Sequence, residues 1–143
     1  MGGFTLLELL VAMGMLAVVV SGTVAALIAC TGLTGASKNM HIATTAALGL
    51  AEEIHSAPFT QIVDDYNNLN FLVNAIPSSR GVVYVDDTNP DLLQVTVSVC
   101  WRQGGRIIGE DANLDGVLDA NEDANGNGII DSPVQIVMQV ANR

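Results

Sequence analysis

The stretch that decides the fold stands at the start of the chain and reads GFTLLELLVAM, residues 3–13. It opens an almost uninterrupted apolar run over residues 4–33, in which the one charged side chain is Glu8. A helix rises about 1.5 Å per residue, so this run is long enough to span a bilayer. A carboxylate at mid-bilayer costs about 2.5–3.5 kcal/mol, and Glu8 therefore needs a compensating partner.

The same stretch resembles the cleavage signature of type IV prepilins and of type II secretion pseudopilins. In that family a prepilin peptidase cuts after the glycine, methylates the new amino-terminal phenylalanine, and leaves a glutamate as the fifth mature residue. The resemblance implies a cut between Gly3 and Phe4, with residues 1–3 as a leader remnant. Family leaders normally carry Lys or Arg, and this one has neither.

The resemblance also implies a partner for Glu8, namely the Phe4 amino group of a neighbouring subunit during assembly. Opposite charges in a low dielectric offset each other's desolvation when their geometry is good. In the alternative interpretation, Glu8 reaches the cytoplasmic interface of the membrane. The implied partners are other pilin or pseudopilin subunits, the prepilin peptidase and the inner membrane. The implied location is the bacterial inner membrane, and then a periplasmic or extracellular filament.

Beyond the apolar run the sequence becomes amphipathic over residues 34–57, where apolar residues recur at spacings of three and four. Pro58 ends this pattern because proline cannot donate the helical hydrogen bond. We therefore predict a helix over residues 4–57, with residues 4–33 in the membrane or filament core. His41 and His55 are expected to face solvent.

The remaining residues, 58–143, are predicted to form a small domain in which strands dominate. A short helix is expected near residues 60–66, and a strand over 81–85. Residues 93–102 alternate apolar and polar side chains, which is the pattern of a half-buried strand and leaves Cys100 on its more polar face. A hairpin turn at 103–105 and a final strand near 134–140 complete an α+β fold: a long N-terminal α-helix packed against a small antiparallel β-sheet.

The charge distribution excludes some partners. The net charge is −10, and the five basic residues are scattered, so we predict no nucleic-acid contact. Seven of the fifteen acidic residues lie between Glu110 and Asp131. The two cysteines, Cys30 and Cys100, are interpreted as partly buried thiols, with an intramolecular disulfide as the less favoured alternative.

The acidic segment, predicted as a loop over residues 109–132, begins with a full match to the pattern D-x-[DN]-x-[DN]-G-x5-E and resembles an EF-hand loop. Calcium takes six to eight oxygen ligands, which this spacing supplies along a tightly curled loop. The predicted Ca²⁺ ligands of this first site are Asp111, Asn113, Asp115, the Val117 carbonyl, Asp119 and Glu122.

The pattern repeats at once with a twelve-residue period. The predicted oxygens of the second site are Asp123, Asn125, Asn127, the Ile129 carbonyl and Asp131. Its twelfth position is Val134, so the second site is expected to be weaker or to share ligands with the first. Because the flanking residues are strand-like, the tandem resembles dockerin-like or thrombospondin-repeat-like calcium loops.

Two functional hypotheses follow. The first is a structural subunit, a minor pilin or a pseudopilin, whose head is stabilised by calcium. The alternative is a membrane-anchored calcium-dependent binding module that does not polymerise. An enzyme is not expected, since the sequence shows no nucleophile–base pair, phosphate-binding glycine loop or His/Cys catalytic metal cluster.

Overall fold

The computed structural model describes residues 5–142. Gly3 and Phe4, which flank the predicted cut, lie outside these residues. Contacts divide the chain into two compact units, Met1–Ser37 and Lys38–Arg143. One helix, α1 (Leu6–Ser56), contributes residues to both units.

The start of α1 is set by Thr5 and Glu8. The Glu8 backbone N–H donates to the Thr5 hydroxyl at 3.3 Å, and the Leu9 N–H donates to the Thr5 carbonyl at 3.2 Å. Thr5 is therefore the N-cap residue, and Glu8 occupies the third helical position, where its backbone N–H is capped. The carboxylate also lies in the first turn, where the helix dipole favours negative charge.

The first unit exposes apolar side chains all around the helix. The large hydrophobic residues between Leu6 and Leu33 are 49–79% exposed. The hydroxyls of Ser21, Thr23 and Thr31 donate to backbone carbonyls three residues earlier, which satisfies them without water. The helix is thus long and apolar enough to cross a membrane, as the sequence predicted.

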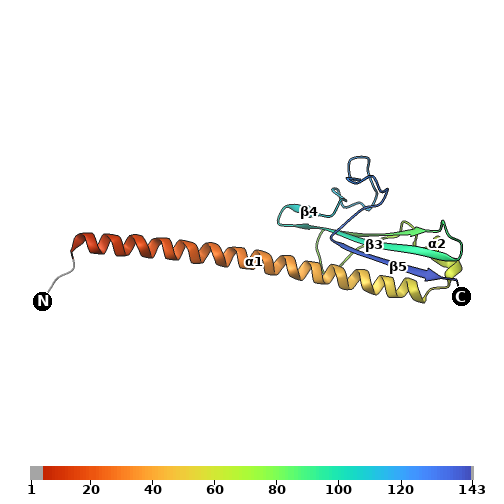
Figure 1. Ribbon diagram of the computed structural model, residues 1–143, viewed down its shortest axis with the longest axis horizontal. Helices are drawn as coiled ribbons and strands as arrows, with labels where there is room; N and C mark the ends of the chain where they lie inside the picture. The colour runs from red at the N-terminus through yellow and green to blue at the C-terminus, as the bar shows by residue number, and fades with distance from the viewer. Residues whose placement is uncertain (1–4, 143) are drawn as a thin grey trace. The chain divides into compact units, whose positions relative to one another are not determined.

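The second unit is built on an antiparallel sheet (Figure 1). Its elements after α1 are α2 (Phe59–Tyr66), β1 (Asn70–Phe71), β2 (Ser79–Asp86), β3 (Leu92–Gln103), β4 (Arg106–Ile108) and β5 (Val134–Ala141). Every strand pair is antiparallel. The predicted α+β class is confirmed: a long N-terminal helix and a small antiparallel sheet of five strands.

The core of this unit lies between the sheet and residues 38–56 of α1. The helix contributes Ala43, Ala47, Ala51 and Ile54, whose spacings of four, four and three place them on one face. The strands contribute alternate residues, including Val95, Val97, Val99 and Trp101 of β3. Small alanines allow the helix to lie close to the sheet, and Trp101 is the largest fully buried side chain. The apolar face of β3 packs in the core as predicted, but the expectation of a half-buried strand was wrong, since Thr96, Ser98 and Cys100 on the other face are also buried.

β4 and β5 lie end to end along the same edge of β3. Ile108 of β4 pairs with Trp101, and Val134 of β5 pairs with Val99. Within β3, Cys100 alone lacks a partner on this edge. The acidic segment, here defined as the insertion (residues 109–133), therefore interrupts one strand at a single position.

The insertion covers the face of the sheet opposite α1 (Figure 1). A second apolar cluster forms there from Val82, Cys100 and Ile130, with Leu114 and Leu118 packed against it. Cys100 does lie away from the helix, but it is 1% exposed, and it is a free thiol. The expectation of a partly buried side chain was wrong, because apolar residues of the insertion cover this polar face.

Candidate functional site

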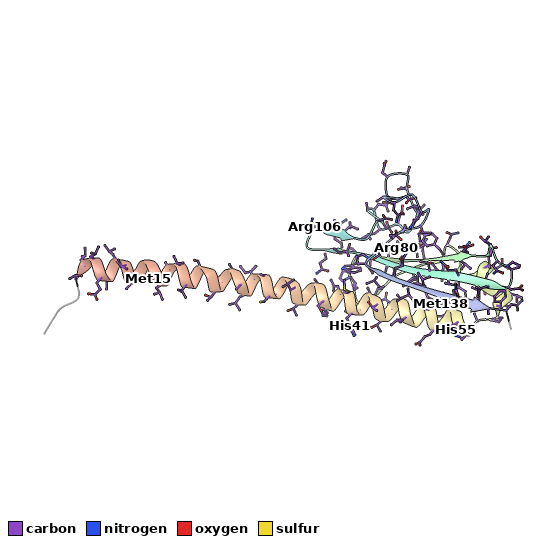
Figure 2. All side chains as sticks on the ribbon, in the orientation of Figure 1. Met15, His41, His55, Arg80, Arg106 and Met138 are labelled. Carbon is purple, nitrogen blue, oxygen red and sulfur yellow. The ribbon has the colours of Figure 1, made fainter. Side chains whose placement is uncertain are left out.

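Hydrogen bonds attach the insertion to the sheet. The Ile130 N–H donates to the Tyr84 hydroxyl at 3.1 Å, and the Arg80 Nε donates to the Leu114 carbonyl at 3.1 Å. Figure 2 shows Arg80 on the sheet beneath the insertion. The Ser132 hydroxyl donates to the Val99 carbonyl where the chain re-enters the sheet. These bonds couple the order of the insertion to strands β2 and β3.

The first loop, residues 111–122, curls around its own acidic side chains. Asp111 is 0% exposed, and its two carboxylate oxygens accept the N–H groups of Asp115 at 3.2 Å and Gly116 at 2.9 Å. Asn113 Oδ1 accepts the Asp115 N–H at 2.9 Å, and Asp115 Oδ1 accepts the Val117 N–H at 2.8 Å. Successive side-chain oxygens are thereby turned toward the inside of the loop.

Gly116 is required at the sixth position of this loop. Its φ is +80°, a conformation that L side chains rarely adopt, and an added Cβ would collide with the Asn70 side chain and come within 3.1 Å of Arg80 Cγ. The glycine thus permits both the sharp turn and the close approach to the sheet.

The second loop, residues 123–131, repeats these hydrogen bonds with an offset of twelve residues. Asp123 accepts the N–H groups of Asn127 at 3.1 Å and Gly128 at 3.0 Å, as Asp111 does in the first loop. Asn125 Oδ1 and Asn127 Oδ1 accept the N–H groups two residues further on, each at 3.0 Å. The backbone conformation repeats as well, since Gly128 has a φ of +78° and Gly116, twelve residues earlier, has a φ of +80°. The repeat seen in the sequence is also a repeat in structure.

Side-chain amides stand between the carboxylates of each loop. Asn113 Nδ2 donates to Asp115 Oδ2 at 2.9 Å and to Asp119 Oδ2 at 3.2 Å. In the second loop, Asn125 Nδ2 and Asn127 Nδ2 both donate to one oxygen of Asp131, at 2.5 and 2.9 Å. The amide N–H groups thus supply positive partial charge between acidic oxygens, as a bound cation would.

The donor set fits calcium. It consists of carboxylate, amide and carbonyl oxygens, which this hard cation prefers. Within residues 5–142, no three Asp, Glu, His or Cys side chains form a preformed metal centre. Ion binding would therefore require the side-chain amides, Asn113 among them, to turn their oxygens toward the ion.

The negative charge of the loops favours ion binding and the turning of the side-chain amides that it requires. Burial raises the pKa of Asp111, and the nearby Glu122 carboxylate raises it further, against the lowering effect of the loop N–H groups. The sequence has no Lys or Arg from Ile107 to Asn142. A cation would neutralise charge that the insertion itself leaves uncompensated.

Glu110 lies outside both predicted calcium loops. In the structure Glu110 Oε1 accepts the Ala124 N–H at 3.3 Å, and Oε2 accepts the Asp131 N–H at 3.0 Å, both in the second loop. The sequence repeat indicates this residue, because the repeat begins one residue before the calcium-loop pattern. Glu-Asp-Ala-Asn occurs at 110–113 and again at 122–125.

The remaining predicted positions lie on α1 or outside the described residues. Glu8 is exposed in the first unit, together with Cys30. His41 and His55 are exposed on α1 in the second unit, as expected (Figure 2). The predicted processing residues Gly3 and Phe4 are not among those described.

Cys100 offers a test of how firmly the insertion is held. Its sulfur lies 3.9 Å from the Asp131 carbonyl, and burial raises the pKa of the thiol. In a Cys30→Ser variant we expect iodoacetamide to modify Cys100 at pH 8 at least tenfold more slowly than in 6 M urea, measured by mass spectrometry, because opening of the insertion must come first. Equal rates would show that the insertion does not cover this face.

No protein-family model, curated protein or solved structure matches the chain. What the protein does is therefore inferred from its own residues and fold.

Proposed function

We propose that the protein is a structural subunit, a minor pilin or a pseudopilin, of a type IV pilus or a type II secretion pseudopilus. It is cut after Gly3 by a prepilin peptidase, held in the bacterial inner membrane, and assembled through its N-terminal helix into a periplasmic or extracellular filament. The observation that carries this proposal is the apolar surface of α1 from Leu6 to Leu33, which no part of the described chain covers.

Two environments can cover such a surface. A bilayer covers it before assembly, and the same helices of neighbouring subunits cover it in a filament. The small residues Gly14, Ser21 and Gly22 suit close contact between helices, and an added Cβ at either glycine would point into open space beside the helix. The pilin-like layout of the chain, with its long apolar helix and small antiparallel sheet, agrees with this proposal.

Glu8 favours a filament subunit over a simple membrane anchor. In a plain anchor the carboxylate gains only the favourable interaction with the helix dipole, whereas a filament subunit pairs it with the Phe4 amine of a neighbour. The capping role of residue 8 needs only its backbone N–H, so the carboxylate is available for that pair. The alternative function, a calcium-dependent binding module that does not polymerise, gives the carboxylate no such partner.

The second part of the proposal concerns the insertion. Outside the cytoplasm, where calcium reaches millimolar concentrations, the two loops bind Ca²⁺ and hold the insertion on the sheet. The proposed ligands are those predicted from the sequence, and no catalytic role is assigned to them. In this proposal calcium stabilises the second unit, and the apolar part of α1 makes the contacts between subunits.

Substitution of Glu8 tests the assembly role. With the peptidase and the pilus or secretion machinery of the source cell, we expect Glu8→Ala to be cut after Gly3, and its incorporation into filaments to fall at least about tenfold, which corresponds to 1.4 kcal/mol. Mass spectrometry measures the cut, and immunoblotting of sheared filaments measures incorporation.

The matched control is Glu52→Ala, which removes an exposed carboxylate from the second unit. It should assemble like the natural chain. An uncut natural chain, or normal assembly of Glu8→Ala, would contradict the filament mechanism and favour the non-polymerising module.

A further inference from the structure

The twelve-residue repeat of the insertion includes a glutamate that stands outside the calcium-loop pattern. Residues 110–119 read EDANLDGVLD, and residues 122–131 read EDANGNGIID. The first residue of each unit is therefore Glu110 or Glu122. Glu110 immediately precedes Asp111, which opens the first loop, and Glu122, the twelfth residue of the first loop, immediately precedes Asp123, which opens the second.

Each of these glutamates bonds to the loop that it does not precede. Glu122 accepts the N–H groups of Ala112 at 2.8 Å and Asp119 at 3.2 Å, which are positions 2 and 9 of the first loop. Glu110 accepts the N–H groups at positions 2 and 9 of the second loop, those of Ala124 and Asp131. Each glutamate thus leads into one loop and closes the other.

The formal twelfth residue of the second loop cannot perform this role. Val134 is the first residue of β5, pairs with Val99, and is 3% exposed in the core between the sheet and α1. A carboxylate at that position would lie in the apolar core rather than in the loop. The structure instead brings Glu110 to the equivalent place.

Burial supplies an independent reason to expect ions here. Asp111 is fully buried and Glu122 is 8% exposed, yet the partners of their carboxylates are backbone N–H groups. Among residues 107–142 there is no basic side chain to compensate them. Buried carboxylates without a cationic partner are costly, which a bound cation relieves.

We infer that Glu110 is the closing carboxylate of the second loop, so that the insertion binds two Ca²⁺ ions as one reciprocal unit. This inference rests on the proposed calcium role and goes beyond it by completing the second site. It also predicts cooperativity. Ordering one loop fixes the glutamate that closes the other, so the first ion lowers the ordering cost for the second.

Calcium binding to the full chain in detergent tests the inference. Equilibrium dialysis from 0.01 to 10 mM calcium should give two ions per chain with a Hill coefficient above 1. Glu110→Gln keeps an oxygen that can accept the loop N–H groups but removes the charge. It should lower the affinity of the second loop at least about tenfold and bring the Hill coefficient to 1.

Two further variants make the comparison specific. Glu52→Gln makes the same charge change on the exposed face of α1 and should bind like the natural chain. Glu110→Asp keeps the charge but withdraws it by one methylene, so it should weaken the second loop and spare the first. Circular dichroism checks that each variant is folded. If Glu110→Gln does not fold, calcium binding by Glu110→Asp is the test of the inference.

The outcomes separate this inference from the proposed function. Two ions in the natural chain with unchanged binding in both Glu110 variants, or one ion in the natural chain, would overturn the reciprocal site and leave a calcium-stabilised head. No calcium bound by the natural chain would overturn the calcium part of the proposed function itself.

Discussion

Calcium at 10 mM is expected to raise the Tm of the full chain in detergent by about 10 °C or more over its value in EDTA. Extracellular calcium modules bind with a Kd near 0.1–1 mM. At 10 mM calcium a single site adds about 2.7 kcal/mol to the free energy of unfolding if its Kd is about 0.1 mM, and two sites of about 1 mM add about as much together. For a domain of this size each kcal/mol raises Tm by about 4–8 °C.

The physical reason is that ion binding and ordering of the insertion are linked. The carboxylates of the two loops repel one another without metal, and the insertion is bonded to β2 through Tyr84 and Arg80. An ion that orders the loops therefore stabilises the sheet on which they rest. The fluorescence of Trp101, the one tryptophan, reports unfolding of that sheet.

The double variant Asp111→Asn, Glu122→Gln should lose most of the calcium effect, because it removes the first and last charged ligands of the first loop. Asp64→Asn, Glu52→Gln changes the net charge equally at exposed positions outside the insertion and should retain the effect. The proposed structural calcium site would be contradicted if calcium did not raise the Tm of the natural chain, or if it raised the Tm of the double variant by the same amount.

Local patterns in the sequence predicted most of the secondary structure. The apolar run and the spacing of alanines predicted α1, and the alternation from Leu93 to Trp101 predicted β3 and its buried face. The Gly104–Gly105 turn was predictable because glycine adopts positive φ without strain, and the two residues have φ of +56° and +84° in the structure. Each of these features depends on neighbours in sequence.

Features that depend on distant residues were not predicted. The two-residue strand β1 forms because Phe71 lies against Gly81 of β2, where an added Cβ would meet the phenyl ring. Cys100 is buried because Ile130, thirty residues away, packs on the same face. Glu110 was missed because the calcium-loop pattern begins at Asp111, although the repeat begins one residue earlier. Tertiary contacts, not local propensity, decide these positions.

Replacing residues 109–133 with a single serine is expected to fuse β4 and β5 into one strand. Ile108 and Val134 already pair with residues of β3 that are two apart, so one linking residue opposite Cys100 preserves the register. The core beneath the sheet contains no side chain from this segment. Removing a loop of about 25 residues also lowers the closure cost by about 3 kcal/mol. We therefore expect a folded sheet that no longer responds to calcium.

The variant also needs Val82→Thr and Cys100→Thr, because the insertion would no longer cover these residues. Its Tm should lie within about 5 °C of that of the natural chain in EDTA, and should not change with calcium. Hydrogen exchange of residues 134–141 measures whether β5 remains paired.

The matched control joins Ile108 directly to Val134 with no linking residue. A strand shifted by one residue turns every side chain to the other face, so Val134 and Val140 would leave the core. This control should unfold or lose protection in β5, whereas the one-residue linker should not. If both variants fold equally well, the insertion does not interrupt a single strand. If neither folds, the acidic loops are part of the folding unit and not an addition to it.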